Sequence, residues 1–183
     1  MKKYLITSRE FYTDTPAVFR SILHEQIQMH LPSYVLYRDK SNPDYNTQAE
    51  YAVQVCSQFE DVKCFIHQDI DLAKKLNATG VHLTSKQFSE IKKAKDLGLE
   101  VIISTHTHDE VLDAQKEGAN AVTYSPIFTS PNKGKAKGVK DLEELLKKCS
   151  IKVFALGGIV TQDEILQIEK TSTYGFASIR YFY

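Results

Sequence analysis

The stretch EVIISTHTHDEVLDAQKEGANAVTY, residues 100–124, decides the fold class of this protein. Its two ends, 100–104 and 120–124, are rich in β-branched and apolar side chains, a composition typical of β-strands. Between them, residues 108–119 carry apolar side chains three or four positions apart, which predicts an amphipathic helix. A strand, a helix and a second strand with such short connections predict a right-handed βαβ unit with parallel strands.

The same unit recurs on both sides of this stretch. Further runs that predict strands are residues 3–7, 34–37, 63–67, 80–83, 152–156 and 174–178. Helical patterns occupy residues 16–30, 47–59, 70–77, 85–98 and 139–149. Gly80, Gly98 and Gly118 stand where helices should end and strands begin. Eight alternating units predict a closed (β/α)8 TIM barrel of the α/β class, and an open doubly wound sheet is the alternative.

The end of the chain predicts an irregularity in this barrel. Only five residues, IRYFY at 179–183, follow the eighth predicted strand. We therefore expect a truncated barrel that lacks the last helix, built as a single domain over residues 1–183. The missing helix would expose apolar surface beside the first and eighth strands, and large apolar patches are usually covered. We expect residues 180–183 to fold over this gap, or a second subunit to cover it in a homodimer.

Composition and charge narrow the function classes. The chain has 183 residues, of which 42% are hydrophobic, and its 23 basic residues balance its 23 acidic ones. This balance argues against nucleic acid and anionic membranes as partners. No apolar stretch approaches the roughly 18 residues of a membrane span. Cys56, Cys64 and Cys149 are odd in number and widely spaced, which predicts reduced thiols and a cytoplasmic location.

Candidate binding residues follow the predicted strands, where a parallel barrel places its active site. Cationic side chains there are Arg38, Lys40, Lys133 and Lys135, and neutral donors are Ser104, Ser130, Asn132 and the amides of Gly157 and Gly158. Guanidinium, ammonium, hydroxyl and amide donors around glycines are typical of a phosphate or diphosphate site. The loop SPIFTSPNKGKAKG, residues 125–138, would then cover the anion. The alternative is that these segments are ordinary solvated turns.

Three histidines lie at consecutive predicted strands. His67, His82 and His106 would permit a zinc site, which is one interpretation of the cluster. The other is that His82, which alternates with Val81 and Leu83, points into the barrel as a hydrogen-bonded core residue. His67 and His106 would then stand at the rim, where they could contact phosphate or act as an acid or base near neutral pH.

Several motifs together resemble one known family. The motifs are YLIT, YRDK, LAKKLNATGVHL, ISTHTHDEV, SPIFTSPNKGKAKG and ALGGI, and they span residues 4–179. Their order and spacing resemble those of thiamine phosphate synthases and their thiazole tautomerase relatives. The resemblance implies a (β/α)8 barrel that couples hydroxymethylpyrimidine diphosphate to thiazole phosphate and releases diphosphate. It also implies magnesium as a cofactor, and phosphorylated pyrimidine and thiazole ligands as partners.

The resemblance assigns roles residue by residue. It places Arg38, Lys40, Ser104 and Lys133 at the diphosphate, Ser130 and Asn132 in the hydroxyl-rich loop, and Gly157, Gly158 and Ser178 at the thiazole phosphate. We count Arg38, Lys40 and Lys133 as catalytic, because they would stabilise the departing diphosphate. His67 is added to them as a candidate acid or base.

Departures from the family pattern concern the metal and the base. Where the family carries magnesium-binding aspartates, this chain has Gln68 and Gln87. Asp39 and Asp69 are near in sequence but do not occupy the matching positions, and the tautomerase histidine would fall at Pro126. The sequence thus predicts a thiamine phosphate synthase-like enzyme that is divergent. A thiazole phosphate tautomerase with another base, or a phosphate-ligand binding protein without catalysis, are the alternatives.

Overall fold

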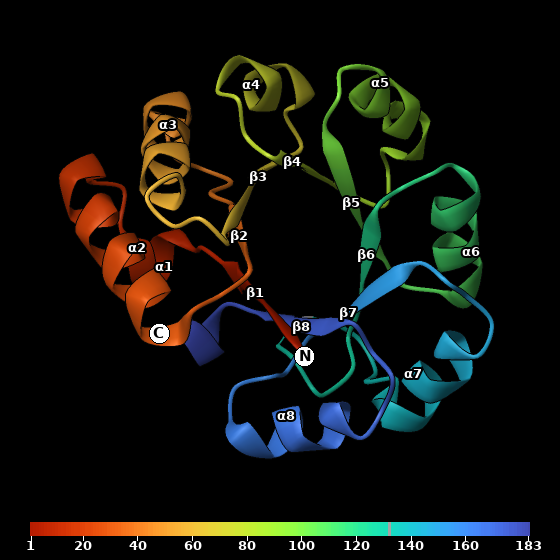
Figure 1. Ribbon diagram of the computed structural model, residues 1–183. Helices are drawn as coiled ribbons and strands as arrows, with labels where there is room; N and C mark the ends of the chain where they lie inside the picture. The colour runs from red at the N-terminus through yellow and green to blue at the C-terminus, as the bar shows by residue number, and fades with distance from the viewer. Residues whose placement is uncertain (132) are drawn as a thin grey trace.

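Eight parallel strands close into a barrel in the computed structural model, which describes residues 1–131 and 133–183 (Figure 1). The strands are β1 (Lys2–Ile6), β2 (Tyr34–Tyr37), β3 (Lys63–His67), β4 (Gly80–Leu83), β5 (Glu100–Thr105), β6 (Ala121–Tyr124), β7 (Lys152–Leu156) and β8 (Gly175–Ser178). Each strand pairs with the next one, and β8 pairs with β1 through Leu5 and Ser178. This closure confirms the predicted TIM barrel and excludes the open sheet.

The helices form a ring outside the strands (Figure 1). They are α1 (Arg9–Tyr12), α2 (Pro16–His30), α3 (Tyr45–Cys56), α4 (Ile70–Lys75), α5 (Ile91–Asp96), α6 (His108–Lys116), α7 (Gly138–Leu146) and α8 (Gln162–Glu169). A 3₁₀ turn, Phe88–Glu90, precedes α5. The short helix α1 was not predicted from the sequence. Helix α8 also lies outside the residue ranges for which the sequence predicted a helix.

Local side chains explain where several helices begin and end. Asp69 accepts a hydrogen bond from the Leu72 amide at the start of α4, and Thr107 caps α6 in the same way. Thr161 and Glu164 form a reciprocal capping box at the start of α8. Gly98 and Gly118 follow α5 and α6 with φ values of 79° and 84°, as predicted for helix-ending glycines.

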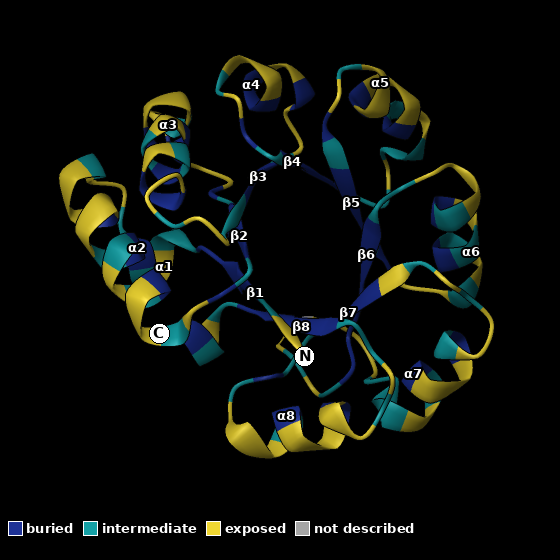
Figure 2. Cartoon of the chain, in the orientation of Figure 1, coloured by how far each residue is buried: buried dark blue, intermediate teal, exposed yellow. Residues whose placement is uncertain are grey.

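Two separate hydrophobic clusters hold the barrel together. The larger one lies between the strands and the helices, where Figure 2 shows buried faces on both. The smaller one fills the barrel itself with large rings, and Tyr4, Tyr34, Phe65 and Phe154 are its aromatic members. The rings of Tyr4 and Phe154 have centres 5.2 Å apart. This part of the barrel interior is therefore a packed core, as is typical of TIM barrels.

The end of the chain covers the place where a helix following β8 would lie. After β8 the described residues form a 3₁₀ turn, Arg180–Phe182, in place of an α-helix. Phe182 is fully buried and stacks on Phe176, with ring centres 5.7 Å apart, and its ring also meets His30 at the end of α2. The Tyr183 ring lies 4.5 Å from that of Phe11, which follows β1. Residues 180–183 thus fold over the gap, as predicted.

Candidate functional site

A cavity of about 640 Å³ opens at the carboxyl ends of the strands, and the loops after all eight strands contribute to its wall. The predicted site residues in this wall are Arg38, Lys40, His67, Ser104, Ser130, Lys133, Gly157, Gly158 and Ser178. Asn132 lies outside the described residues. The volume is typical of a small-molecule site. The fold therefore brings together side chains that are up to 140 positions apart in sequence (38 and 178).

Four cationic residues line this cavity, Arg38, Lys40, Lys133 and Arg180, and the first three are those that the sequence analysis singled out. Lys40 has a lowered pKa, first because of the neighbouring Arg38 charge and then because of burial and Lys133. Burial also lowers the pKa of Arg38. Within residues 1–131 and 133–183, none of the three cations forms an ion pair with a carboxylate. The Asp39 charge opposes the lowering of the Arg38 pKa, and Glu10 also lines the cavity. Neither carboxylate forms an ion pair with these three cations, so their mutual repulsion favours an anionic ligand between them.

The backbone of Arg38 is fixed by Thr7, at the end of β1. The Thr7 hydroxyl accepts a hydrogen bond from the Arg38 amide at 2.9 Å, and it lies 3.5 Å from the Arg38 carbonyl oxygen. The Thr7 amide donates to the carbonyl of Leu36 at 3.0 Å. Sequence analysis did not single out Thr7. The YLIT motif contains it, but only strand pairing shows that it reaches Arg38.

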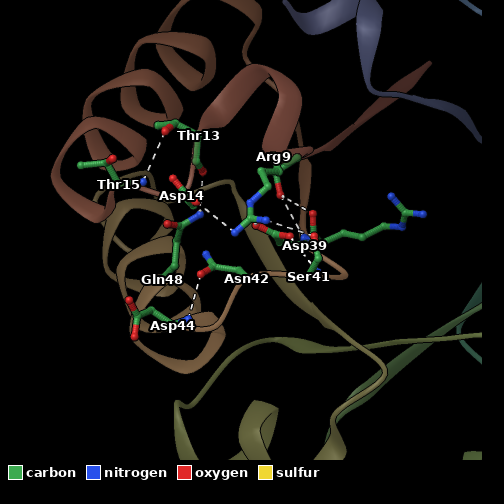
Figure 3. Close-up of polar contacts among 11 residues, drawn as sticks. Arg9, Thr13, Asp14, Thr15, Asp39, Ser41, Asn42, Asp44 and Gln48 are labelled. Carbon is green, nitrogen blue, oxygen red and sulfur yellow. Dashed lines mark hydrogen bonds and ion pairs between the residues drawn. The ribbon is translucent and has the colours of Figure 1, made fainter.

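An ion pair between Arg9 and Asp39 supports the same loop (Figure 3). The Arg9 guanidinium lies 3.7 Å from the Asp39 carboxylate, and it also contacts Asp14 at 3.0 Å and the Ser41 hydroxyl at 3.2 Å. Asp39 also accepts the Ser41 amide at 3.1 Å, and its side chain is only 3% exposed. Arg9 thus ties α1 to the loop that carries Arg38 and Lys40. The Asp39 carboxylate faces the Arg9 guanidinium with Oδ2 and accepts the Ser41 amide with Oδ1.

His67 is neutral in this environment. Burial is the main cause that lowers its pKa to about 4, and the charges of Arg38 and Lys40 add to it. An anion bound among these cations would reverse their effect and raise the His67 pKa. His67 can therefore offer a neutral imidazole to an incoming ligand.

His82 is a hydrogen-bonded core residue, as predicted. It is 3% exposed, its Nδ1 lies 2.9 Å from the Tyr4 hydroxyl oxygen, and its Nε2 lies 3.0 Å from the Ser104 hydroxyl oxygen. Burial lowers its pKa to about 3, with smaller contributions from His67 and Arg38. Tyr4 was not singled out from the sequence, because its place inside the barrel depends on closure.

The zinc interpretation of the histidines has no support in this geometry. Both ring nitrogens of His82 are hydrogen-bonded, and His106 Nδ1 lies 3.2 Å from the carbonyl oxygen of Ser125. In the part of the chain that the structure describes, no three histidine, cysteine or acidic side chains gather as a metal site.

The loops after β6 and β7 pack tightly against each other. The Ile127 amide donates to Leu156 and the Phe128 amide to Gly157, both at 2.9 Å. Gly157 and Gly158 have φ values of 98° and 71°. A Cβ atom on Gly158 would lie 2.5 Å from the Thr129 carbonyl oxygen. Only glycine allows the two loops to approach so closely.

Ser178 lines the cavity but its hydroxyl is already engaged. It donates to the Ile159 carbonyl at 2.7 Å and accepts from the Tyr181 amide at 3.2 Å. The hydroxyl therefore joins the loop after β7 to the turn after β8.

The residues present do not fit a magnesium ion. Gln68 lines the cavity and Gln87 lies beside it, since the Gln87 side-chain amide donates to the Gln68 carbonyl at 3.3 Å. The Gln87 oxygen is occupied by the Thr84 amide at 3.0 Å. Asp39 binds Arg9, and Asp69 caps α4. Magnesium prefers several carboxylate ligands, whereas Glu10 is the one carboxylate among the described residues that line this cavity, and Gln68 and Gln87 supply neutral amides.

Comparison with known proteins agrees with this geometry. The family described as "Thiamine monophosphate synthase" matches residues 3–182. A relative from Aquifex aeolicus, named "Putative thiamine-phosphate synthase 2", is 32% identical over 186 residues, with 98% of this chain and 96% of that protein covered. The thiamine-phosphate synthase of Lactococcus lactis subsp. cremoris (strain MG1363) is 30% identical over 132 residues, covering 69% of this chain and 60% of that protein.

A solved structure gives the same answer. The thiamine phosphate pyrophosphorylase from Pyrococcus furiosus superposes with a TM-score of 0.81 at 25% identity, covering 97% of this chain and 85% of that one. The barrel, the cationic cavity at its carboxyl end and the glycine pair after β7 occur here in a chain whose sequence matches one family over nearly its whole length. This chain therefore belongs to the thiamine monophosphate synthase family.

Proposed function

We propose that this protein is a thiamine phosphate synthase-like transferase that couples hydroxymethylpyrimidine diphosphate to thiazole phosphate and releases diphosphate. The observation that carries the proposal is the convergence of Arg38, Lys40 and Lys133 on one cavity. The charges of Arg38 and Lys133 lower the pKa of Lys40 there, and among the described residues none of the three cations forms an ion pair with a carboxylate. The family to which the chain belongs supports the same activity.

The cavity has a polar and an apolar side that suit such substrates. Arg38, Lys40 and Lys133 would hold the diphosphate, with Ser104, Ser130 and Asn132 as neutral donors. Ile6, Leu36, Leu156 and Ala177 supply apolar wall for the rings. The amides of Gly157 and Gly158 would meet the phosphate of the thiazole, with Ser178 on the same wall of the cavity, since backbone amides at glycines can approach an oxyanion closely.

The reaction would proceed by departure of the diphosphate. The carbon–oxygen bond of the pyrimidine breaks and its electron pair leaves with the diphosphate, whose charge the three cations stabilise. The thiazole nitrogen then donates its lone pair to the resulting carbocation and forms the new carbon–nitrogen bond. His67, neutral in the empty cavity, would gain basicity once the diphosphate is bound and could hydrogen-bond to it.

A binding protein for phosphorylated ligands without turnover is the second candidate. The neutral Gln68 and Gln87 favour it, because a site without a magnesium ion loses one source of leaving-group stabilisation. A thiazole phosphate tautomerase that uses His67 or His106 as its base is the third. It would produce an isomer of its thiazole substrate and no diphosphate.

Product analysis distinguishes these activities. The protein is incubated with both phosphorylated substrates, with and without magnesium, and thiamine phosphate and diphosphate are quantified. The double variant Arg38→Ala with Lys133→Ala should abolish coupling and weaken diphosphate binding more than phosphate binding. Arg20→Ala with Lys92→Ala, which removes the same charges from the outer helices, is the matched control and should behave like the unmodified protein.

The results then have clear meanings. Formation of both products supports the synthase, saturable binding of substrates without products supports the binding protein, and isomerisation alone supports the tautomerase. Failure of the unmodified protein to bind diphosphate, thiazole phosphate or inorganic phosphate at millimolar concentration would contradict all three.

We also propose a homodimer and a cytoplasmic location, with neither nucleic acid nor membrane as partner. Met29 and Leu31 flank the His30 contact with the carboxyl-terminal turn, and both are more than two-thirds exposed, at 70% and 73%. A second copy would bury them. Among the described residues, none of the helices combines the length and the apolar character needed to traverse a bilayer. Light scattering should give twice the chain mass of 20.8 kDa, and Leu31→Lys should reduce it to that mass.

A further inference from the structure

We propose that Tyr4 and His82 orient the Ser104 hydroxyl as a one-way hydrogen-bond donor toward a ligand oxyanion. Tyr4 does not line the cavity, so it would act as a positioning residue through two intervening groups. The proposal rests on the proposed function, because the oxyanion is that of the diphosphate. It goes beyond that function in naming the residues that determine what Ser104 can do.

The donor-to-acceptor direction of the hydrogen bonds that link Tyr4, His82 and Ser104 is determined at Tyr4. Its side chain is fully buried among the rings of Tyr34, Phe65 and Phe154. Within residues 1–131 and 133–183, His82 Nδ1 at 2.9 Å is the one hydrogen-bond partner of the Tyr4 hydroxyl. If the hydroxyl accepted from Nδ1–H, its own hydrogen would be buried without an acceptor, which costs about 1–3 kcal/mol. Tyr4 therefore donates to Nδ1.

This donation fixes the tautomer of His82. A neutral imidazole carries one hydrogen, and a ring whose Nδ1 accepts must carry it on Nε2. The ring is neutral because burial lowers its pKa to about 3. Nε2–H then points at the Ser104 oxygen, 3.0 Å away, and donates to it.

The hydroxyl hydrogen of Ser104 is consequently free to be donated to a ligand. Its oxygen accepts from His82, and among the described residues no other hydrogen bond involves its hydroxyl. Ser104 lines the cavity, so its hydrogen is available to an oxyanion there. The same direction excludes Ser104 as a base-activated nucleophile, because Nε2 already carries a hydrogen and cannot take the serine proton.

The test removes the first link. In Tyr4→Phe the ring packing is kept and only the hydroxyl is lost, so Nδ1 no longer has a donor. The Nδ1–H tautomer then becomes accessible, and in it Nε2 accepts the hydrogen of Ser104. Tyr34→Phe is the matched control. Tyr34 is also a buried ring of the barrel interior, 5.7 Å from that of Tyr4, but its hydroxyl pairs with Tyr174 at 3.0 Å.

Two independent measurements test these hydrogen bonds: the tautomer of His82 and the affinity for diphosphate. Nitrogen-15 spectra of the histidine rings, taken without ligand, should show the Nε2–H tautomer for His82, in the unmodified protein and in Tyr34→Phe. Tyr4→Phe should shift it toward Nδ1–H. Calorimetry with inorganic diphosphate should show binding weakened about tenfold or more by Ser104→Ala, the loss expected for one hydrogen bond to a charged group. Tyr4→Phe should weaken it several-fold, and Tyr34→Phe should not.

A double variant completes the argument. Tyr4→Phe should have no further effect on diphosphate binding in a Ser104→Ala background, because its effect passes through that hydroxyl. An Nδ1–H tautomer of His82 in the unmodified protein would overturn the proposed direction of the hydrogen bonds from Tyr4 to Ser104, whatever ligand the protein binds. If Tyr4→Phe lowers the diphosphate affinity equally in the unmodified protein and in the Ser104→Ala variant, then Tyr4 does not act on the ligand through Ser104, and this part of the proposal is overturned. Absence of diphosphate binding by the unmodified protein would overturn the proposed function, while the ring spectra still decide the direction.

Discussion

At the scale of single residues, Gln68 and Gln87 determine whether a metal can enter the cavity. Gln68 lines the cavity together with Arg38, Lys40 and Lys133, and the Gln87 side chain donates to the Gln68 carbonyl, so each supplies a neutral amide where the family resemblance predicts a carboxylate. We expect the unmodified protein to bind magnesium weakly, and Gln68→Asp with Gln87→Asp to bind it at millimolar concentration, because two carboxylates would then face one ion. Calorimetric titration with magnesium chloride measures both.

The control for this prediction is Asp39→Asn. Asp39 is held by Arg9, so its loss should leave magnesium binding by the double variant unchanged. Strong magnesium binding by the unmodified protein that Asp39→Asn abolishes would show that Asp39 is a ligand and that our assignment is wrong.

A second prediction for a single residue concerns His82 and the pH dependence of the free energy of unfolding. Its pKa is about 3 in the folded protein, while an unfolded histidine titrates near 6.5. Between pH 6.5 and 3 His82 therefore binds a proton in the unfolded chain but not in the folded protein. The free energy of unfolding falls as the pH is lowered through this range. The slope from one such group is about 1.4 kcal/mol per pH unit. Urea unfolding at several pH values should show a shallower acid slope for His82→Gln than for the unmodified protein, and equal slopes would contradict the assignment.

At the scale of elements, the contact between the loops after β6 and β7 depends on glycine. Gly158→Ala should cost about 3 kcal/mol or more, because an αL backbone strain adds to an overlap with Thr129. Gly98→Ala is the matched control, since Gly98 has a similar φ of 79° and open space around a Cβ atom. We expect it to cost only about 1–2 kcal/mol of strain. Thermal and urea unfolding compare the two, and equal losses would show that the loop contact adds nothing.

The whole molecule should unfold as one unit. Closure by β1 and β8 makes every strand depend on two neighbours, and both hydrophobic clusters include residues from the two ends of the chain. Circular dichroism and the fluorescence of the ten tyrosines should therefore give coincident urea transitions, which also tests the single domain predicted for residues 1–183. Two separated transitions would show that part of the barrel folds by itself.

The sequence by itself determined the order of strands and helices, and with it the fold. Local patterns suffice for this, because the alternation of short β-branched runs with amphipathic segments acts over neighbouring residues, as in 100–124. It also identified Arg38, Lys40 and Lys133, since strand ends in a parallel barrel share one face. Short α1 was missed, because four residues carry too little periodicity to be recognised.

Only the tertiary structure decided what the polar side chains do. Asp39 and Asp69 look like possible metal ligands in the sequence, yet one pairs with Arg9 and the other caps α4. Ser178 appears to offer a hydroxyl that the fold has already used. The roles of Tyr4 and His82 arise from a hydrogen bond across 78 positions. Such contacts are set by barrel closure, and a buried polar group is defined by the partner that closure brings to it.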